Sequence, residues 1–288
     1  MKIIKNVNIK WATSIFSAAF SAIFSAQALS ETSHQPLTPL PSVIDYTEGN
    51  GWSSGVGLKA ESAPVFHGSD YYELSIKLEG AVQWRNDNHI FYWEGFDLNY
   101  TELGWRGLVK DKWLMEAGLR HEIVIPSARS ERAGLDQLPH RGSHVLWFVD
   151  TKYAIGGGWK NWVSGRFTGG SNQYGWQSKI EAGHSFGSGL GNNGLALILF
   201  STFGNENNLN NYFGVSDTDA TESGLRSISL DGGYRSSGLN IIYRKNMGEN
   251  MQITAEADVE LYSDDIEKSE LVTDPSKTTA AVSVIWTF

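Results

Sequence analysis

The sequence predicts an all-β protein, a transmembrane, antiparallel, up-and-down β-barrel of about twelve strands. Three observations support this fold class. Apolar and polar residues alternate with period two in segments of about ten residues, the length that a tilted membrane strand needs. An export signal precedes these segments. The last segment ends on an aromatic residue, Phe288.

Residues 1–28 have the three parts of a secretory signal peptide. Three lysines within the first ten residues form a basic start, and an apolar stretch runs from Trp11 to Phe24. Small residues follow at Ala26-Gln27-Ala28, so we predict cleavage after Ala28. The apolar stretch could instead be an anchor, but it is shorter than the roughly 20 residues of a spanning helix.

The mature chain is expected to be acidic and free of disulfides. Removal of the signal leaves 20 basic residues against 32 acidic ones, a net charge of −12 with histidine neutral, which argues against a nucleic-acid partner. The chain has no cysteine, so something other than disulfides must hold the exported fold, and a closed hydrogen-bonded barrel would suffice. Residues 29–50 contain Pro36, Pro39 and Pro41 and are predicted as a flexible periplasmic segment, followed by the barrel at 51–288.

Three segments alternate most clearly: Tyr72 to Trp84, Tyr174 to Phe186 and Met251 to Tyr262. As a helix, the last of these would have no apolar stripe. Weaker alternation predicts nine further strands, at 52–61, 89–94, 97–107, 112–122, 145–155, 159–168, 194–203, 232–246 and 277–288. A slip in the alternation near Gly238 predicts a β-bulge there.

The lengths of the connections support an even number of strands. The longest, at 123–144, 204–231 and 263–276, are all odd-numbered along the chain. The even-numbered ones are short, at 85–88, 108–111, 156–158, 187–193 and 247–250. In a bacterial barrel both chain ends lie in the periplasm, so the long connections are predicted to face outward.

A soluble antiparallel barrel or sandwich would also alternate. Charged residues on the polar faces argue against a packed soluble interior. Aromatic residues at strand ends are typical of the girdles of membrane barrels: Tyr72 and Trp84, Tyr174 and Phe186, Trp286 and Phe288.

Two blocks of sequence resemble the MltA-interacting protein (MipA) / OmpV family. The first is Tyr212-Phe213-Gly214-Val215-Ser216, followed by Ala220 and Ser223-Gly224-Leu225. The second, Leu261 to Leu271, is similar to the family's penultimate strand and outer loop. The chain departs from the family at Ser269-Glu270, where Ser-Pro is usual, and at Trp286-Thr287-Phe288, where Tyr-Lys-Phe is usual. Its alternating last strand also resembles the C-terminal signature that the outer-membrane insertion machinery recognises.

The resemblance implies a non-enzymatic protein of the bacterial outer membrane, in contact with outer-membrane lipid and lipopolysaccharide. The family's namesake is similar to a scaffold that brings a membrane-bound murein lytic transglycosylase to a penicillin-binding protein. Other members are described as adhesion proteins or porin-like proteins, so a small porin-like channel and a surface adhesin remain alternatives.

No residue is predicted to be catalytic, to bind a cofactor or to bind a metal. Gly183-His184-Ser185-Phe186-Gly187 matches a nucleophile elbow and Gly189 to Gly194 a dinucleotide fingerprint, but neither is followed by the helix that such a site needs. A histidine and carboxylate cluster around the 123–144 loop could serve a metal or an outer hydrolase, although a solvated loop is favoured. Its members are His121, Glu122, Glu131, Asp136, His140 and His144.

The outer loops are rich in acidic residues, which could bind divalent cations or form a solvated face. They are Asp217, Asp219, Glu222, Asp264, Asp265, Glu267, Glu270 and Asp274.

The inward faces are predicted to carry both signs of charge. The basic residues are Lys77, Arg120, Lys152, Lys160, Arg166 and Lys179, and the acidic ones are Glu73, Glu79, Glu116, Asp150, Glu181, Glu256, Asp258 and Glu260. These charges could line an open, ion-selective channel or pair across a closed lumen, and their balance favours a filled lumen.

Overall fold

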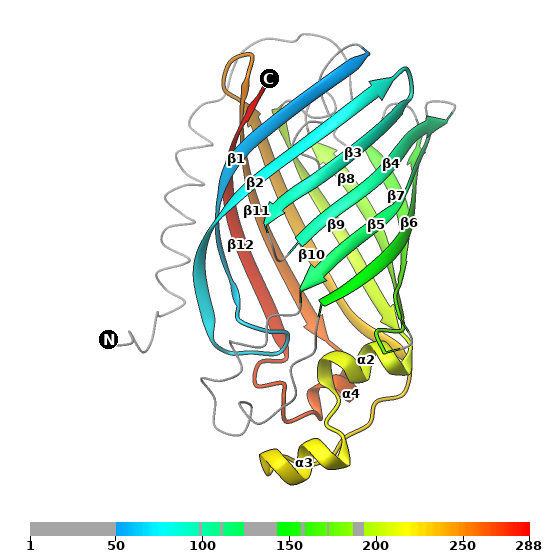
Figure 1. Ribbon diagram of the computed structural model, residues 1–288, viewed down its shortest axis with the longest axis vertical. Coiled ribbons are helices and arrows are strands. Elements are labelled where there is room, and N and C mark those ends of the chain that lie inside the picture. The colour runs from blue at the N-terminus through cyan, green and yellow to red at the C-terminus, as the bar shows by residue number, and fades with distance from the viewer. Residues whose placement is uncertain are drawn as a thin grey trace. The chain divides into compact units, whose positions relative to one another are not determined.

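The computed structural model describes residues 50–97, 100–109, 112–123, 143–156, 159–171, 173–186 and 193–288. The predicted signal peptide and the segment up to residue 49 lie outside these ranges. Twelve antiparallel strands close into one barrel, in which each strand pairs with its sequence neighbours and β1 pairs with β12 (Figure 1). The predicted fold class and strand number are therefore confirmed.

The strands are β1 (Gly51–Pro64), β2 (Tyr72–Asn86), β3 (His89–Asp97), β4 (Tyr100–Val109), β5 (Trp113–Ile123), β6 (Ser143–Ile155), β7 (Asn161–Gly169), β8 (Trp176–Phe186), β9 (Asn193–Gly204), β10 (Gly233–Asn246), β11 (Met251–Tyr262) and β12 (Ser276–Thr287). Helices α2 (Glu206–Phe213) and α3 (Asp217–Ser223) lie between β9 and β10, and α4 (Asp264–Glu267) lies between β11 and β12. Each of the twelve segments predicted from alternation coincides with one strand, and the three helices were not predicted.

The bulge in β10 was predicted at the wrong residue. The register with β9 shifts between Tyr234 and Ser236, whereas the pairing runs unbroken through Gly238. Gly238 serves close packing instead, because a Cβ there would lie 2.2 Å from the carbonyl oxygen of Val259 and 2.4 Å from the Phe200 ring.

The two ends of the barrel differ in their connections. The barrel starts at Gly51 and finishes at Phe288 at the end with the short connections, which we call the turn end. Here the backbone of Phe288 donates to Ser54 O at 2.8 Å and accepts from Ser54 N at 3.3 Å, so the last residue closes the ring. The strand ends that flank the three long connections all lie at the opposite end, which we call the loop end, and this agrees with the predicted parity (Figure 1).

The outward faces of the strands are apolar and carry aromatic groups near both ends. At the turn end Trp113 and Tyr153 have ring centroids 4.6 Å apart. At the loop end Trp147, Phe167 and Trp176 form a row with centroid spacings of 5.5 and 5.4 Å. Such rows are typical of the girdles of membrane barrels.

Tyr174 was wrongly predicted to belong to this girdle. It lies in the turn before β8 and is buried in the mouth of the barrel, because the chain enters β8 two residues later than predicted. The described residues contain no helix that is both long and apolar enough to cross a membrane.

The wall is unevenly paired along β2. This strand pairs with β1 from Tyr72 to Arg85 but with β3 only from Ala81 to Asn86. No described strand pairs with residues 72–80 on the β3 side. Three outward side chains of that stretch, Leu74, Ile76 and Leu78, are 73%, 77% and 52% exposed.

Candidate functional site

The lumen is the candidate site, because the inward faces of the strands bring ionisable side chains together there. Most of the predicted inward residues do lie inside the barrel. Lys160 does not, since it precedes β7 and is exposed, and Glu73 is exposed at the loop end of β2. Sequence reasoning missed a second set of inward residues: Lys59, Glu61, Tyr92, Glu94, Glu102, Arg106, Arg235 and Arg244.

One buried carboxylate, Glu102 on β4, joins several strands. Glu102 Oε2 lies 2.9 Å from Arg120 on β5 and 3.0 Å from Arg166 on β7. Its Oε1 accepts a hydrogen bond of 2.9 Å from the Tyr92 hydroxyl. The Arg166 guanidinium also lies 4.0 Å from the centroid of the Phe148 ring. Two guanidinium groups thus share one carboxylate, which leaves this group of side chains cationic.

A second buried pair adjoins it. Arg106 and Glu116 lie 3.2 Å apart, and their side chains are 1% and 2% exposed. The Tyr92 hydroxyl also donates to Glu116. Such burial is tolerated only where charges are paired and hydrogen-bonded. These contacts fill the lumen beside β3, β4 and β5.

The β1–β2 side of the lumen holds a separate ion-pair group. Glu61 lies 3.0 Å from Lys59 and 2.6 Å from Lys77, and Lys59 lies 3.8 Å from Glu79. Here lysines and glutamates are equal in number, so this group is electrically balanced.

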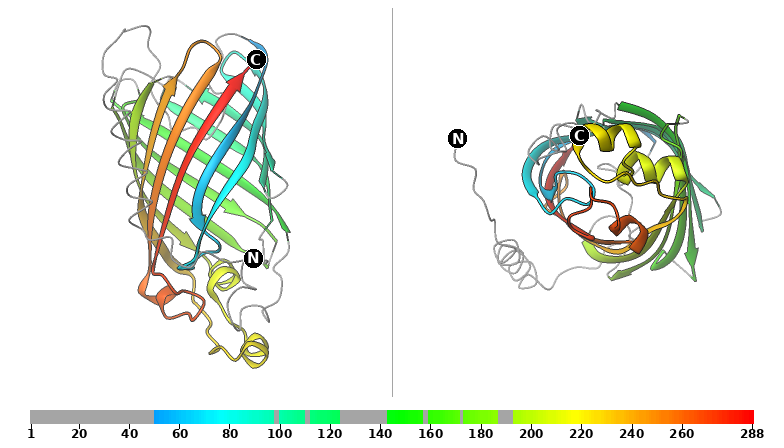
Figure 2. Two further views of the ribbon diagram at one scale, coloured as in Figure 1. Left: turned by 90° about the vertical axis from the view of Figure 1, so that its left-hand side faces the viewer. Right: turned by 90° about the horizontal axis from the view of Figure 1, so that it is seen from below.

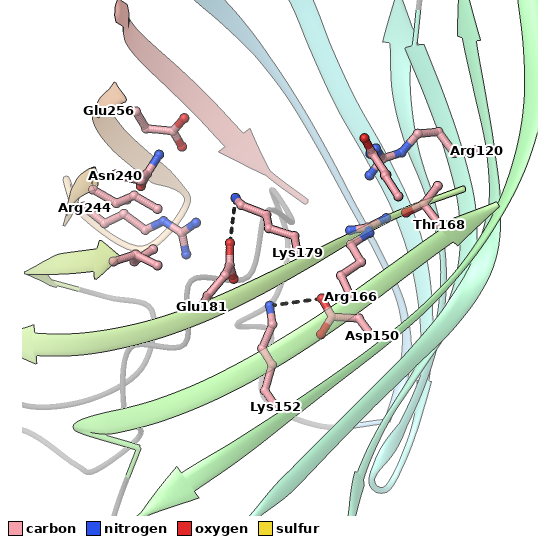
Figure 3. A pocket seen from close by; sticks show the side chains of 13 residues that line it. Arg120, Asp150, Lys152, Arg166, Thr168, Lys179, Glu181, Asn240, Arg244 and Glu256 are labelled. Carbon is pink, nitrogen blue, oxygen red and sulfur yellow. Dashed lines mark ion pairs between the residues drawn. The ribbon is translucent and has the colours of Figure 1, made fainter. Parts of the chain in front are cut away.

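A cavity of about 330 Å³ lies in the lumen against β5 to β11, and we call it the chamber. Its lining has five basic residues, Arg120, Lys152, Arg166, Lys179 and Arg244, and three acidic ones, Asp150, Glu181 and Glu256. Figure 3 shows Arg244, Asn240 and Glu256 on one side of the chamber and Arg120, Arg166 and Asp150 on the other.

Two ion pairs also belong to the lining of the chamber. Lys179 and Glu181 are 2.7 Å apart, and Ser164 donates a further hydrogen bond of 3.0 Å to Glu181. Lys152 and Asp150 are 3.9 Å apart, which is longer than a hydrogen bond (Figure 3). The basic residues of the lining exceed the acidic ones, and the chamber is therefore suited to an anion.

Toward the turn end the chamber adjoins an apolar cluster. We call it the turn-end cluster, and it consists of Leu114, Ala154, Trp159, Trp162, Ala196, Ile198 and Ile242. Trp162 is 1% exposed, and a Cβ at Gly183 would lie 1.9 Å from its ring, so glycine is what lets the indole lie against the wall. Ile198 and Ile242 also line the chamber.

Toward the loop end the mouth of the barrel is covered by apolar side chains. This mouth cluster consists of Leu146, Tyr174, Leu209, Tyr212, Phe213, Leu230, Tyr262 and Ile266. Leu146 is on β6 and Tyr262 on β11, nearly opposite in the ring, so the cluster spans the mouth. Figure 2 shows the helices and their loops lying across the opening.

The two sequence blocks that resemble the family build this cover. Ser216 caps α3 in a capping box with Asp219, and Gly224 ends the same helix with a left-handed φ of 74°. Ser269 of the second block donates a hydrogen bond of 2.6 Å to the carbonyl oxygen of Phe213 in the first. The blocks therefore belong to one folded unit. The capping box of Ser216 and Asp219 is a sequence signal from which α3 could have been predicted.

Arg235 connects the cover to the chamber. Its guanidinium lies 4.9 Å from the ring centroid of Tyr212 and 5.3 Å from that of Phe213. It also donates to Gln177, which lines the chamber, at 3.3 Å, and lies 3.4 Å from His67 Nδ1. This arginine therefore fixes the underside of the mouth cluster.

The two described histidines of the cluster considered around the 123–144 loop, His121 and His144, are not brought together. His121 on β5 pairs with Val145, whose side chain faces outward. His144 is on the inward face, with its ring 5.4 Å from that of Tyr174. Glu131, Asp136 and His140 lie outside the described residues. Ser185 of the elbow-like sequence is inside strand β8, and the dinucleotide-like turn up to residue 192 is not described.

Several acidic residues of the outer loops contact other residues of the loop-end surface, either within one loop or between two loops. Asp217 accepts from the Ser227 hydroxyl at 2.6 Å, and Asp265 lies 2.6 Å from Lys268. Glu270 accepts from the backbone of Arg226 at 3.0 Å. These contacts fit a solvated, self-contained surface. The fully exposed ammonium of Lys268 has a raised pKa because it is hydrogen-bonded to Asp265.

The model of the MltA-interacting protein MipA family matches residues 56–288, so the match covers the whole barrel except the start of β1. The chain belongs to this family. The family that the two blocks indicated is thus confirmed. No curated protein sequence matches the chain.

The fold is similar to several solved barrels. An outer membrane channel from Pseudomonas putida F1 shares 11% sequence identity with a TM-score of 0.47, over 91% of this chain and 100% of that one. The Ralstonia pickettii toluene transporter TbuX shares 11% with a TM-score of 0.39, over 83% and 89%. The CymD monoaromatic hydrocarbon channel shares 10% with a TM-score of 0.41, over 83% and 89%.

Proposed function

We infer that the protein is a non-enzymatic outer-membrane barrel that serves as a membrane-embedded scaffold for a murein enzyme. The observation that carries this proposal is the filled lumen, covered at its loop end by the mouth cluster and crossed by buried ion pairs. A barrel closed in this way suits a structural role better than the flow of solutes.

The partner is proposed from the family. The family's name records an interaction with MltA, and on this basis the proposed partner is a murein lytic transglycosylase. The resemblance to the family's namesake adds a penicillin-binding protein to the proposed assembly. Murein lies in the periplasm, which by the parity of the strands is the side of the turn end. The partner would therefore dock on the short turns or on the 29–50 segment. Lipid and lipopolysaccharide would surround the apolar belt.

Crosslinking in intact envelopes, followed by pull-down in mild detergent, tests the scaffold. We expect a lytic transglycosylase in the eluate. Met247, which is exposed in the β10–β11 turn, offers a turn-end variant, Met247→Asp, and Asp265→Ala is the matched variant at the loop end. Recovery should fall for Met247→Asp and remain for Asp265→Ala. Repeated recovery of no murein enzyme would contradict the scaffold, and absence of the barrel from outer-membrane fractions would contradict the location.

A narrow channel is the second candidate, and the chamber is the observation that favours it. Planar-bilayer recordings separate the two functions. The scaffold predicts no conductance steps for the natural protein. Steady steps at low voltage would instead support the channel.

A surface adhesin would use the exposed acidic faces of α3 and α4. If cells that lack the protein adhere to surfaces as well as cells that have it, the adhesin role is excluded.

A further inference from the structure

We propose that the chamber binds a small hydroxylated anion of the size and chemistry of a sugar phosphate. The proposal concerns a ligand site inside the barrel and does not depend on any partner at the turn end. It is carried by three properties of the lining, namely its charge, its buried polar atoms and its apolar floor.

The charge of the lining favours an anion. Five basic residues face three acidic ones around the chamber. Arg120 and Arg166 both lie against the single carboxylate of Glu102, which does not itself line the chamber. The side chains of Arg120 and Arg166 are only 18% exposed, so their charge acts on a bound anion with less screening than at the outer surface. The balanced group at Lys59, Lys77, Glu61 and Glu79 has no such excess.

Buried polar atoms of the lining indicate the chemistry of the ligand. Arg166 Nε, Asp150 Oδ1 and Asn240 Oδ1 are buried and have no hydrogen-bond partner among the described residues. Buried polar atoms are normally satisfied, so these three offer hydrogen-bonding positions to a group inside the chamber. The guanidinium N–H donates to an anionic oxygen, and the two oxygen atoms accept from hydroxyl groups. Together they fit an anion that also carries hydroxyls.

Size and shape fit a compact ligand. A cavity of about 330 Å³ lies at the small end of the range for small-molecule pockets. Ile198 and Ile242 give it an apolar floor against the turn-end cluster, which suits the C–H face of a sugar ring. Thr168 and Gln177 add further hydrogen-bonding groups at the side. A monosaccharide with one phosphate combines these features.

Equilibrium dialysis of the purified full chain in phosphate-free detergent buffer tests the proposal. The probes are glucose 6-phosphate, inorganic phosphate and glucose. The mouth cluster covers the chamber, so dialysis also includes Phe213→Ala, which removes a fully buried ring from the cover. We expect glucose 6-phosphate to bind most tightly, inorganic phosphate more weakly and glucose least, with faster uptake in Phe213→Ala. No binding of either phosphate to either protein overturns the proposal, as does equal binding of glucose and glucose 6-phosphate.

Variants within the lumen locate the site. Arg244→Gln is expected to raise the dissociation constant about tenfold or more, and Arg244→Lys to raise it less, because the charge is kept. Lys77→Gln is the matched control, since Lys77 is luminal but does not line the chamber. Lys152→Met is a second chamber variant in case Arg244→Gln does not fold. An equal loss in Lys77→Gln and in the chamber variants would overturn the location.

Discussion

The two ends of the lumen are closed by different parts of the chain. At the turn end the cluster around Trp162 is made mostly of strand side chains, which belong to the hydrogen-bonded wall. At the loop end the mouth cluster is made mostly of helices and connections, such as Phe213 on α2 and Ile266 on α4.

This difference bears on stability. Strand residues unfold with the barrel as one cooperative unit, whereas connections can open locally at a lower free energy. The turn-end cluster should therefore contribute to the free energy of unfolding of the whole barrel. The mouth cluster should mainly keep the cover closed over the mouth of the barrel. Substitutions at the two ends can separate these contributions.

Trp162→Ala should have the largest effect. Truncating a buried tryptophan typically lowers the free energy of unfolding by about 3–5 kcal/mol, and this indole is fully buried against Gly183. Urea unfolding in detergent, followed by the folded band on unheated gels, measures the loss. Trp147→Ala on the outward face is the control and should cost less, since Trp147 is 46% exposed. Equal losses would contradict the distinction between inner and outer tryptophans.

Phe213→Ala should act locally. Its buried ring contributes on the order of 3 kcal/mol to the packing of the cover, but the barrel wall does not depend on it. We expect faster proteolysis between residues 205 and 232, with an unchanged midpoint of barrel unfolding. A fall in the midpoint as large as that of Trp162→Ala would show that cover and wall unfold together.

Ser269→Ala should have a smaller effect at the same place. It removes the 2.6 Å hydrogen bond to the Phe213 carbonyl that joins the two family blocks, at a cost of about 1 kcal/mol. Amide hydrogen exchange in α2 and α4 should become faster by the factor that corresponds to this loss of free energy. Ser227→Ala, which removes an exposed hydrogen bond to Asp217, is the control, and an equal change there would argue against the special role of Ser269.

Lys268→Ala should leave stability unchanged within error. The pair with Asp265 is fully exposed, and its raised lysine pKa means that any contribution is present while Lys268 is protonated and is lost only as pH rises through that value. Unfolding midpoints at neutral pH and above that pKa should agree with those of the natural protein. A clear drop at neutral pH would give this surface pair a structural role.

Much of the wall could be predicted from the sequence, because a strand with one face in lipid must alternate with period two. The segment from Met251 to Tyr262 shows this directly, with Leu261 and Val259 outward and Glu260 and Tyr262 inward. The alternation of long and short connections also predicted which connections lie at each end of the barrel. Lys160 was misplaced because the turn before β7 is longer than the alternation suggested.

The interior was harder to predict. Glu102 and Arg106 lie on a strand interrupted by Gly104 and Gly107, where alternation is weak. The chamber depends on which strands face each other across the barrel and how far apart they are. A single sequence gives neither the facing strands nor their separation. The covering helices are short, and their apolar residues are sparse. The capping residues are the sequence signals for these helices: Asn205 and Gly214 for α2, and Ser216 and Gly224 for α3.

The half-paired β2 strand has a consequence for the surrounding membrane. Along residues 72–80 about every second backbone amide and carbonyl faces away from β1, toward a side where no described strand lies. Hydrocarbon cannot satisfy such groups, whereas water or lipid headgroups can. We expect the bilayer to be thinned beside β2, next to Leu74 and Ile76. Fast hydrogen exchange at these amides in lipid vesicles would reveal that thinning, and protection equal to that of β11 would argue against it.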